Sequence, residues 1–377
     1  MKMNDIQKYS QDVLPETLQI IRDLCRIPAP SHHEEQRADY CRNWFEKNGF
    51  ENVFIDEALN VIAPLNDQQS NDLVVIMAHT DTVFPDMEPL PLSEDDEFIY
   101  SPGVTDDTAN LAVLMVCSRY YREHRPDNAP GMIIVANSCE EGLGNLKGSR
   151  AIMQRYGSRV REFISLDSSS LHRLTTGAVG SHRYKVTVKT EGGHSFGDFG
   201  NRNAIAVLAN MITMLYSVKV PQNGSSQTTY NVGGITGGTS VNTIAQQAEM
   251  LYEYRSNDRI CLEKMRDMFE KLVAMIQASG VTVDVEILGE RPCSGEIDRQ
   301  RFEALKNRWK AAAGQAQDLP LQERFASTDC NVPLSMGVPA ICFGVCRGSG
   351  AHTREEKLEK ASLVPGCQIL LDLLYRL

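Results

Sequence analysis

Short, mostly apolar runs alternate along the chain with longer amphipathic stretches. The apolar runs are LVVIMA at 73–78, MIIVA at 132–136, FISL at 163–166 and AICFG at 340–344. A run of this kind is typical of a strand that is buried on both faces, whereas apolar positions three or four residues apart are typical of a helix. Such helical patterns occur near 18–24 and 40–45, over 108–122, 146–156 and 301–313, and at the C-terminus. This order predicts an α/β fold with a mostly parallel, doubly wound sheet.

The middle of the chain has a different pattern of apolar and polar residues. In order, the pattern there predicts a strand at 183–190, a helix at 203–217, strands at 228–232 and 248–255, a helix at 259–279 and a strand at 281–288. The order βαββαβ builds a small ferredoxin-like layer. We therefore expect residues 180–290 to form an inserted domain, with residues 1–179 and 291–377 as the two parts of a catalytic, metal-binding domain.

The glycine-rich segment GGITGGT, at 233–239, is expected to be a short loop inside the inserted domain. Such a loop can bind phosphate when a lysine followed by serine or threonine comes after it, but no such pair follows here. We therefore give this segment no phosphate-binding role.

Composition and charge narrow the class of protein. The 377 residues are 42% hydrophobic, enough for a large core, and the net charge of −11 comes without a basic cluster that could neutralise phosphates. We therefore expect no nucleic-acid partner. No run of about 18 apolar residues occurs, and the N-terminus carries charges where a signal peptide would need an apolar core. These features predict a cytoplasmic protein without a membrane span.

Ten cysteines raise the question of a thiolate metal site. No Cys-x-x-Cys pair occurs, and Cys342 and Cys346 form an isolated pair four residues apart. The cysteines are therefore expected to be small buried hydrophobic residues.

Residues of the types that commonly bind metal ions follow the apolar runs. They are His79 and Asp81 after the first run, Glu140 and Glu141 after the second, Asp167 after the third, and His352 after the fourth. Asp106 and Asp107 follow a glycine-containing loop and precede a helix. In doubly wound sheets, ligands bind outside the carboxyl ends of the strands, so these side chains should meet at one sheet edge. A His-x-Asp or a Glu-Glu pair alone is weak evidence, and their joint placement favours a metal site.

Histidines and carboxylates without thiolates suit Zn²⁺, with Co²⁺ or Mn²⁺ as substitutes. The set is large enough for two divalent ions. We expect one ion to be held by His79 and Asp167 and the other by His352 and Glu141. Asp106 would bridge them, because a carboxylate has two oxygens and can hold two cations.

Two acidic residues then remain for other tasks. Asp81 lies two residues after His79 and is expected to accept the other imidazole N–H, which would fix the tautomer of the ring. Glu140 lies beside a metal ligand and is expected to act as general base, taking a proton from an activated water and delivering it to the leaving amine. The predicted reaction class is metal-assisted amide hydrolysis.

These motifs resemble those of a known family. AHTDTV (78–83), GVTDD (103–107), CEEG (139–142), LD (166–167) and GAHTREE (350–356) are similar, in the same order, to the metal motifs of certain dinuclear zinc hydrolases. That family includes peptidase T, carboxypeptidase G, aminoacylase, acetylornithine deacetylase and succinyl-diaminopimelate desuccinylase. In the inserted segment, GGHSFGDFGNRNAI (192–205) resembles the family's GxHS…NAI pattern.

The resemblance implies the same ligand set and the same roles for Asp81 and Glu140, and it adds three residues. His194 matches a histidine that, in family dimers, reaches the partner's active site and helps to bind the carbonyl oxyanion. Asn242 matches an asparagine that contacts substrate near this oxygen, and Arg255 matches an arginine that holds a substrate carboxylate. The resemblance thus implies a homodimer formed through the inserted domain, which would also act as a lid.

The chain departs from the family pattern after Asp107, where Thr108-Ala109 replaces the usual Lys-Gly. An aspartate at position 167 is commoner in the aminopeptidases and dipeptidases of the family. We therefore expect a zinc exopeptidase that cleaves short peptides, similar to peptidase T or to the dipeptidases. The alternatives are an N-acyl amino acid deacylase or carboxypeptidase with the same metal site and, more remotely, a non-catalytic binding protein.

Overall fold

The computed structural model describes residues 3–67, 70–316 and 319–377. The chain divides into two compact units, the first made of Met1–Ala178 and Gly295–Leu377 and the second of Val179–Ser294. Each unit has its own hydrophobic core. The second unit is therefore an insertion in the sequence of the first.

The first unit contains an eight-stranded sheet. Its strands are β1 (Phe54–Ile55), β2 (Val61–Leu65), β3 (Leu73–His79), β6 (Gly131–Asn137), β7 (Val160–Leu166), β8 (Arg173–Ala178), β15 (Gln322–Ala326) and β16 (Ala340–Phe343). They lie in the order β1-β2-β6-β3-β7-β16-β8-β15. The four central strands β6, β3, β7 and β16 pair in parallel, whereas β2 joins β6 and β8 joins β16 in antiparallel fashion. The predicted mostly parallel α/β sheet is confirmed.

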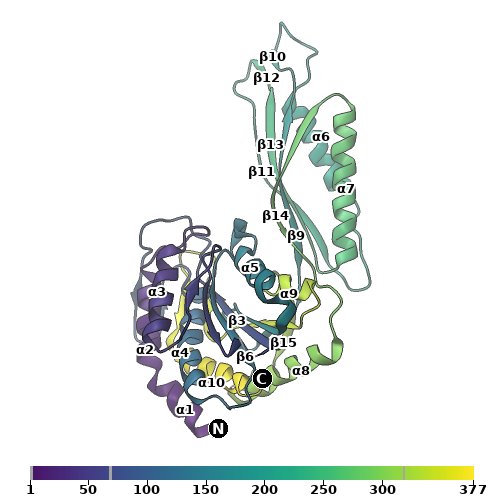
Figure 1. Ribbon diagram of the computed structural model, residues 1–377. Coiled ribbons are helices and arrows are strands. Elements are labelled where there is room, and N and C mark those ends of the chain that lie inside the picture. The colour runs from purple at the N-terminus through teal and green to yellow at the C-terminus, as the bar shows by residue number, and fades with distance from the viewer. Residues whose placement is uncertain (1–2, 68–69, 317–318) are drawn as a thin grey trace. The chain divides into compact units, whose positions relative to one another are not determined.

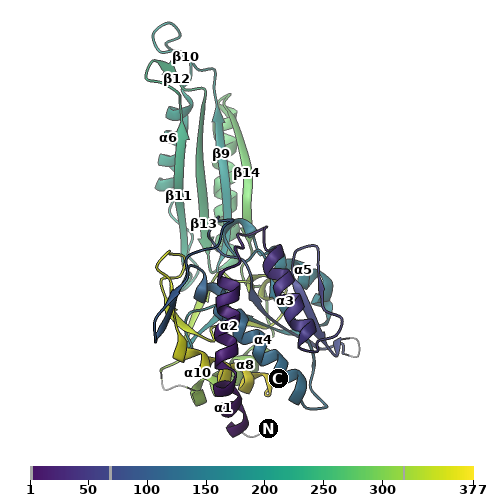
Figure 2. The same cartoon turned by 90° about the vertical axis from the view of Figure 1, so that its left-hand side faces the viewer.

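Helices cover both faces of this sheet (Figures 1 and 2). One face carries α1 (Met3–Asp12), α2 (Leu14–Cys25), α3 (Glu35–Lys47), α4 (Ala109–His124), α8 (Arg299–Ala316) and α10 (Leu363–Leu374). The other carries α5 (Lys147–Tyr156) and α9 (Asn331–Ser335). Along β3, Val74 and Ile76 face the first group while Val75 and Met77 face the second. Burial on both faces explains why this strand is apolar from Leu73 to Ala78.

The first unit also contains a small antiparallel sheet. It consists of β4 (Ser93–Glu94), β5 (Phe98–Tyr100), β17 (Arg347–Ser349) and β18 (Lys357–Glu359). β17 and β18 pair with each other, so the intervening residues 350–356 form the loop between two paired strands. This loop contains His352, and the small sheet fixes both of its ends.

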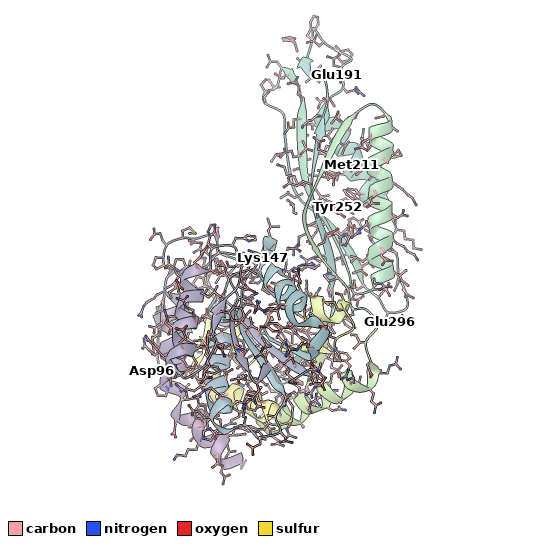
Figure 3. All side chains as sticks on the ribbon, in the orientation of Figure 1. Asp96, Lys147, Glu191, Met211, Tyr252 and Glu296 are labelled. Carbon is pink, nitrogen blue, oxygen red and sulfur yellow. The ribbon has the colours of Figure 1, made fainter. Side chains whose placement is uncertain are left out.

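The second unit has the predicted ferredoxin-like order. Its main elements are β9 (Gly180–Lys189), α6 (Ala204–Ser217), β11 (Thr228–Gly237), β13 (Gln247–Ser256), α7 (Arg259–Ala278) and β14 (Thr282–Arg291). The strands lie in the order β11-β13-β9-β14, and β10 (Gly193–His194) and β12 (Thr243–Ile244) form a separate two-stranded antiparallel sheet. Asn203 and Asp258 cap α6 and α7 by accepting bonds from main-chain N–H groups. Met211 and Tyr252, labelled in Figure 3, lie in the core between helices and sheet.

One local expectation is wrong. Residues 233–237 of the GGITGGT segment continue β11 rather than forming a loop. They pair with β13 as far as Gly237, after a register shift between Val232 and Gly234. Glycine lowers the intrinsic strand propensity here, and the long neighbouring strand β13 supplies the pairing that overcomes this preference.

Two further observations concern the whole of the described chain. No helix in the three described ranges is long and apolar enough to cross a membrane. All ten cysteines are buried and free, which confirms their expected role as small buried residues.

Candidate metal centre

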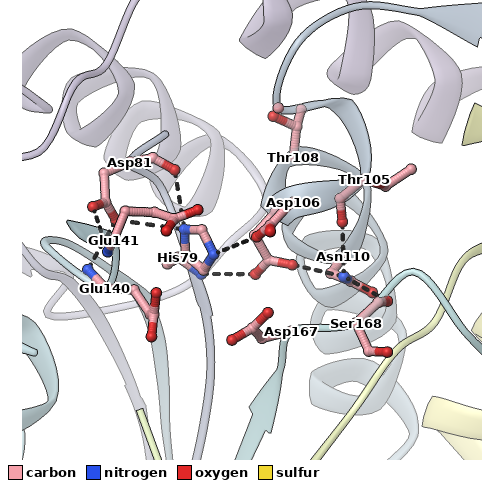
Figure 4. Close-up of polar contacts among 12 residues, drawn as sticks. His79, Asp81, Thr105, Asp106, Thr108, Asn110, Glu140, Glu141, Asp167 and Ser168 are labelled. Atoms are coloured by element: carbon pink, nitrogen blue, oxygen red, sulfur yellow. Dashed lines mark hydrogen bonds and ion pairs between the residues drawn. The ribbon is translucent and has the colours of Figure 1, made fainter. Parts of the chain in front are cut away.

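The candidate metal ligands come together where the central strands end. β3 ends at His79, Glu140 and Glu141 follow β6, and Asp167 follows β7 directly. These three strands are neighbours and parallel, so their carboxyl ends lie at one sheet edge. A turn before α4, at Val104–Thr108, adds Asp106, whose backbone conformation is not helical. Figure 4 shows these side chains converging around His79.

His79 is held between two acceptors. Its Nδ1 lies 3.0 Å from the main-chain oxygen of Asp81 and 3.4 Å from the Asp81 carboxylate, and its Nε2 lies 3.0 Å from Asp106 Oδ1. The expected contact of the ring with Asp81 therefore exists, but its shorter part goes to the main-chain oxygen. Burial opposes protonation of the ring, yet the charge of Asp107 and the bond to Asp106 raise the His79 pKa well above its usual value.

His352 approaches the same aspartate from the other side. Its Nε2 lies 3.0 Å from Asp106 Oδ2 and 3.2 Å from Glu141 Oε1. Hydrogen bonds with Asp106 and Glu141 raise its pKa to about 11. The two oxygens of Asp106 thus face two different histidines.

The carboxylates are packed more closely than their charges favour. His79, Glu140 and Asp167 have potential ligand atoms within 4.8 Å of one another, and so do His79, Asp106 and Glu141. Burial, followed by the charge of Asp106, raises the Asp167 pKa to about 7, and burial also raises that of Glu141. Such a cluster binds a proton or a cation readily, since unpaired buried charge is costly.

The residues present fit two divalent ions. His79 Nδ1 points at a carbonyl oxygen that can only accept, so this nitrogen carries the proton and Nε2 is left to face a carboxylate. A cation between Nε2 and the carboxylate satisfies both groups. The predicted division of the ligands is compatible with these positions: His79 lies near Asp167, His352 near Glu141, and Asp106 between the two histidines. Glu140 also has an oxygen within 4.8 Å of the potential ligand atoms of His79 and Asp167. Histidine and carboxylate donors suit Zn²⁺, Co²⁺ or Mn²⁺.

Asp81 organises the backbone of the Glu140-Glu141 pair. Its carboxylate is fully buried and accepts bonds from the N–H groups of Glu140 at 3.0 Å and Glu141 at 2.9 Å, and from Ser31 Oγ at 2.6 Å. Hydrogen bonds with His79, Ser31 and main-chain groups outweigh the effect of burial and lower the Asp81 pKa. Asp81 is therefore ionised, and it connects the end of β3 to the turn that follows β6.

Asp107 bonds to a main-chain N–H and to an amide group rather than to the side chain of a candidate ligand. Its Oδ2 accepts the main-chain N–H of His79 at 2.9 Å, and its Oδ1 accepts Asn110 Nδ2 at 2.6 Å. Asn110 Oδ1 in turn accepts the N–H of Val345. Asp107 and Asn110 therefore connect the turn before α4 to the ends of β3 and β16.

Sequence reasoning missed several supporting residues. Ser31, Glu34 and Arg37 lie between α2 and α3 or at the start of α3, and each bonds to a segment that carries a candidate ligand. Glu34 accepts the N–H of Cys139, and Arg37 donates to the carbonyl oxygen of Thr80. The signal in the sequence was weak, namely a polar turn after Pro28 and Pro30. Asn110, in the first turn of α4, was also given no role.

The three remaining predicted residues belong to the second unit. His194 is exposed in β10, and its Nδ1 accepts main-chain N–H groups of Phe196 and Gly197 at 3.2 Å. Asn242 is close by, because its main-chain oxygen accepts the N–H of Ser195. Arg255 lies near the end of β13 that is farther along the chain from β12, and it pairs with both oxygens of Glu253 at 3.0 Å. The second unit thus brings His194 and Asn242 together and keeps Arg255 apart from them.

Comparison with known proteins gives a consistent result. Residues 75–376 match the sequence profile of a family described as peptidase family M20/M25/M40. A succinyl-diaminopimelate desuccinylase from Corynebacterium glutamicum is 24% identical over 375 residues, covering 94% of this chain and 95% of that protein.

Solved structures share the fold over nearly the whole chain. A tripeptidase from Staphylococcus aureus is 21% identical with a TM-score of 0.75, covering 96% of this chain and 98% of its own. A protein from Bacillus subtilis, described as a dinuclear metal binding peptidase from the M20 family, is 15% identical with a TM-score of 0.67, covering 97% and 98%.

Proposed function

The chain belongs to peptidase family M20/M25/M40, and on this premise we propose that it is an exopeptidase that cleaves short peptides at a centre of two divalent metal ions. Membership makes it a metal-dependent hydrolase of amide bonds. The observation that carries the proposal is the shared Asp106, whose two oxygens face His79 and His352 beside a buried cluster of carboxylates.

We assign the metal ligands as His79, Asp106, Glu141, Asp167 and His352. Bound Zn²⁺ ions, or Co²⁺ or Mn²⁺ in their place, polarise a scissile carbonyl and lower the pKa of water to near neutral. The choice of ions rests on the donor set, which contains imidazole and carboxylate groups but no thiolate.

Glu140 is the proposed general base. Only 5% of its surface is exposed, and its main-chain N–H is bonded to Asp81, so its backbone is fixed beside His79 and Asp167. In the proposed reaction its carboxylate takes the proton of the attacking water and passes it to the nitrogen of the leaving amine. Asp81 orients both the imidazole of His79 and the Glu140-Glu141 backbone.

We propose further that two copies of the chain associate through the inserted unit. Ile205, Met214 and Tyr216 of α6 are exposed, as is Ile235 of the edge strand β11. Exposed apolar side chains around an edge strand favour a protein partner. In such a dimer His194 would stabilise the oxyanion in the partner's site, with Asn242 beside the same oxygen.

The substrate is proposed to be a peptide of two or three residues. Asp167 and the fold shared with a tripeptidase support this choice. Arg255 would bind the substrate carboxylate with its planar guanidinium, exchanging Glu253 for the substrate. The same arginine would serve an N-acyl amino acid deacylase or a carboxypeptidase, and similarity to a desuccinylase makes the deacylase the second candidate. Ten free thiols are typical of a reducing compartment and support a cytoplasmic location.

The test is an assay of the Zn²⁺-loaded protein on dipeptides, tripeptides and N-acyl amino acids, with Glu140→Gln and an exposed control, Glu355→Gln. We expect the first variant to lose turnover about 10²- to 10⁴-fold while it still binds metal, because it lacks only the proton acceptor. Glu140→Gln turnover equal to wild type would overturn the assignment. Preferential hydrolysis of N-acyl amino acids would establish the second candidate.

A further inference from the structure

Glu356 is a fully buried carboxylate that lies four residues after His352. Its Oε2 accepts the main-chain N–H of Gly103 at 2.7 Å. Its Oε1 accepts the N–H of Thr105 at 2.7 Å, the Thr105 hydroxyl at 2.6 Å and the N–H of Asp106 at 3.0 Å. All four donors belong to the turn that presents Asp106 to the two histidines. Sequence reasoning gave this residue no role.

The main chain of Glu356 belongs to the same arrangement. Its carbonyl oxygen accepts the N–H of Ser101, next to the pairing of β18 with β5. Residues 101–106 therefore fold around Glu356. Its carbonyl oxygen bonds to Ser101 at the start of this segment, and its carboxylate bonds to Gly103, Thr105 and Asp106.

The turn has little space in which to move. Gly103 has a φ of +74°, and a Cβ added there would lie 2.7 Å from Thr82 Cγ2, next to the loop that carries His79 and Asp81. A Cβ added at Gly348 would lie 2.4 Å from Thr105 Cγ2 on the other side. Close packing on both sides confines the backbone of the turn, and the bonds to Glu356 fix the direction of its N–H groups within that space.

The chemistry of the contact also points to a positioning role. Buried carboxylates are usually paired with a cation, but within the described chain no lysine, arginine or histidine forms an ion pair with Glu356. Burial raises the Glu356 pKa, and the main-chain N–H dipoles and one hydroxyl act against burial by favouring the ionised form. A charge satisfied in this way fixes the shape of the backbone that supplies the donors.

We propose that Glu356 is a positioning residue that holds Asp106 between His79 and His352 and ties the Asp106 turn to the His352 loop. The proposal rests on the two-metal centre of the proposed function. Asp106 is the side chain that both ions would share, so a displaced turn weakens the binding of the second ion once the first is bound. Glu356 itself would contact neither ion, because both of its oxygens are bonded to the turn.

The test measures Zn²⁺ binding, free of any substrate, in Glu356→Gln and in the matched control Glu355→Gln, whose side chain is exposed. An amide offers one acceptor oxygen and turns an N–H₂ group toward N–H donors, so the turn loses bonds without a change in side-chain size. We expect the dissociation constant of the second Zn²⁺ to rise about 10- to 100-fold, the range typical of residues that orient metal ligands. The control should match wild type.

Two further readouts separate positioning from folding. With Co²⁺ in place of Zn²⁺, the visible spectrum should change in Glu356→Gln, and kcat should fall while KM stays within about twofold of wild type. Thr105→Val removes the hydroxyl donor and keeps the three N–H donors, so it should shift second-site affinity in the same direction by a smaller factor.

Wild-type affinity for both ions in Glu356→Gln would overturn the proposal. A second pair of results would also overturn it. In that case Glu356→Gln binds neither ion and has a lower unfolding midpoint, whereas Thr105→Val binds metal like wild type. Failure of the proposed function gives a different result: peptides would not be hydrolysed, or Glu140→Gln would remain active, while the Zn²⁺ titrations of the Glu356 variant still answer the question of positioning.

Discussion

Replacing Asp81 by asparagine tests whether this residue fixes the position of the proposed general base. Asp81 accepts three bonds, from the N–H groups of Glu140 and Glu141 and from the Ser31 hydroxyl, at 2.6–3.0 Å. Glu140 N bonds to Oδ1, whereas Ser31 and Glu141 bond to Oδ2. An asparagine that keeps its oxygen at the Oδ2 position retains two donors and turns its N–H₂ group toward the N–H of Glu140. The substitution therefore loses the bond that holds the general base, together with the longer 3.4 Å contact of Oδ1 with His79 Nδ1.

The size of the effect follows from the type of bond. A hydrogen bond to a buried charged group is worth about 1.5–3 kcal/mol. If this energy contributes to binding of the transition state, kcat/KM falls about 10- to 100-fold, since about 1.4 kcal/mol corresponds to a factor of ten. Ser31→Ala removes a donor from Oδ2 and leaves the Glu140 bond in place, so its effect on kcat/KM should be smaller.

The assay measures kcat/KM on the best peptide substrate, together with urea unfolding, for both single variants and the double variant. Because Ser31 and Asp81 are in direct contact, we expect their effects on kcat/KM to be non-additive by about 0.5 kcal/mol or more. The reasoning is refuted if Asp81→Asn retains kcat/KM within twofold of wild type. It is also refuted if the loss of activity is fully explained by loss of folded protein in the unfolding curve.

Other predictions follow from the remaining parts of the structure. His194→Ala should reduce turnover much more than dimerisation, measured by sedimentation, because the side chain is exposed; an equal loss of both would indicate a packing role. Removal of metal by a chelator should abolish activity, and added Zn²⁺ or Co²⁺ should restore it. The chelated protein should also unfold at a lower temperature, because ions that bind the folded state stabilise it. An unchanged midpoint of thermal unfolding would contradict a buried metal site. Burial and the nearby charge of Arg266 lower the His182 pKa from 6.5 to about 4, against an opposing effect of Glu290. The unfolded chain therefore takes up this proton at higher pH than the folded one, so the His182 contribution to the free energy of unfolding is complete above pH 6.5 and is lost as the pH falls toward 4. After allowance for partial solvent access the loss should be about 1–2 kcal/mol, and urea unfolding at pH 7 and pH 5 should show it in wild type but not in His182→Asn.

The sequence was most informative where structure depends on local pattern. Continuous apolar runs indicated β3, β6, β7 and β16, because strands of a covered parallel sheet are buried on both faces. The chemistry could be placed from the same signal, since the residues after parallel strands must share one sheet edge. His79, Glu140 and Asp167 are brought together for this reason. The metal-binding roles of these residues remain predictions.

Tertiary structure decided what depends on contacts between distant segments. Glu356 and the Asp106 turn are separated by 250 residues, and only the packing of β18 against β5 places the carboxylate under its four donors. Ser31 reaches Asp81 across 50 residues, and the glycines of β11 form a strand because β13 lies beside them. Periodicity carries no information about such partners, because each residue alone is an ordinary polar group or a flexible glycine. The sequence thus determined which side chains could do chemistry and at which edge, and the fold determined which other side chains fix their positions, because a hydrogen bond depends on the positions of both partners in space.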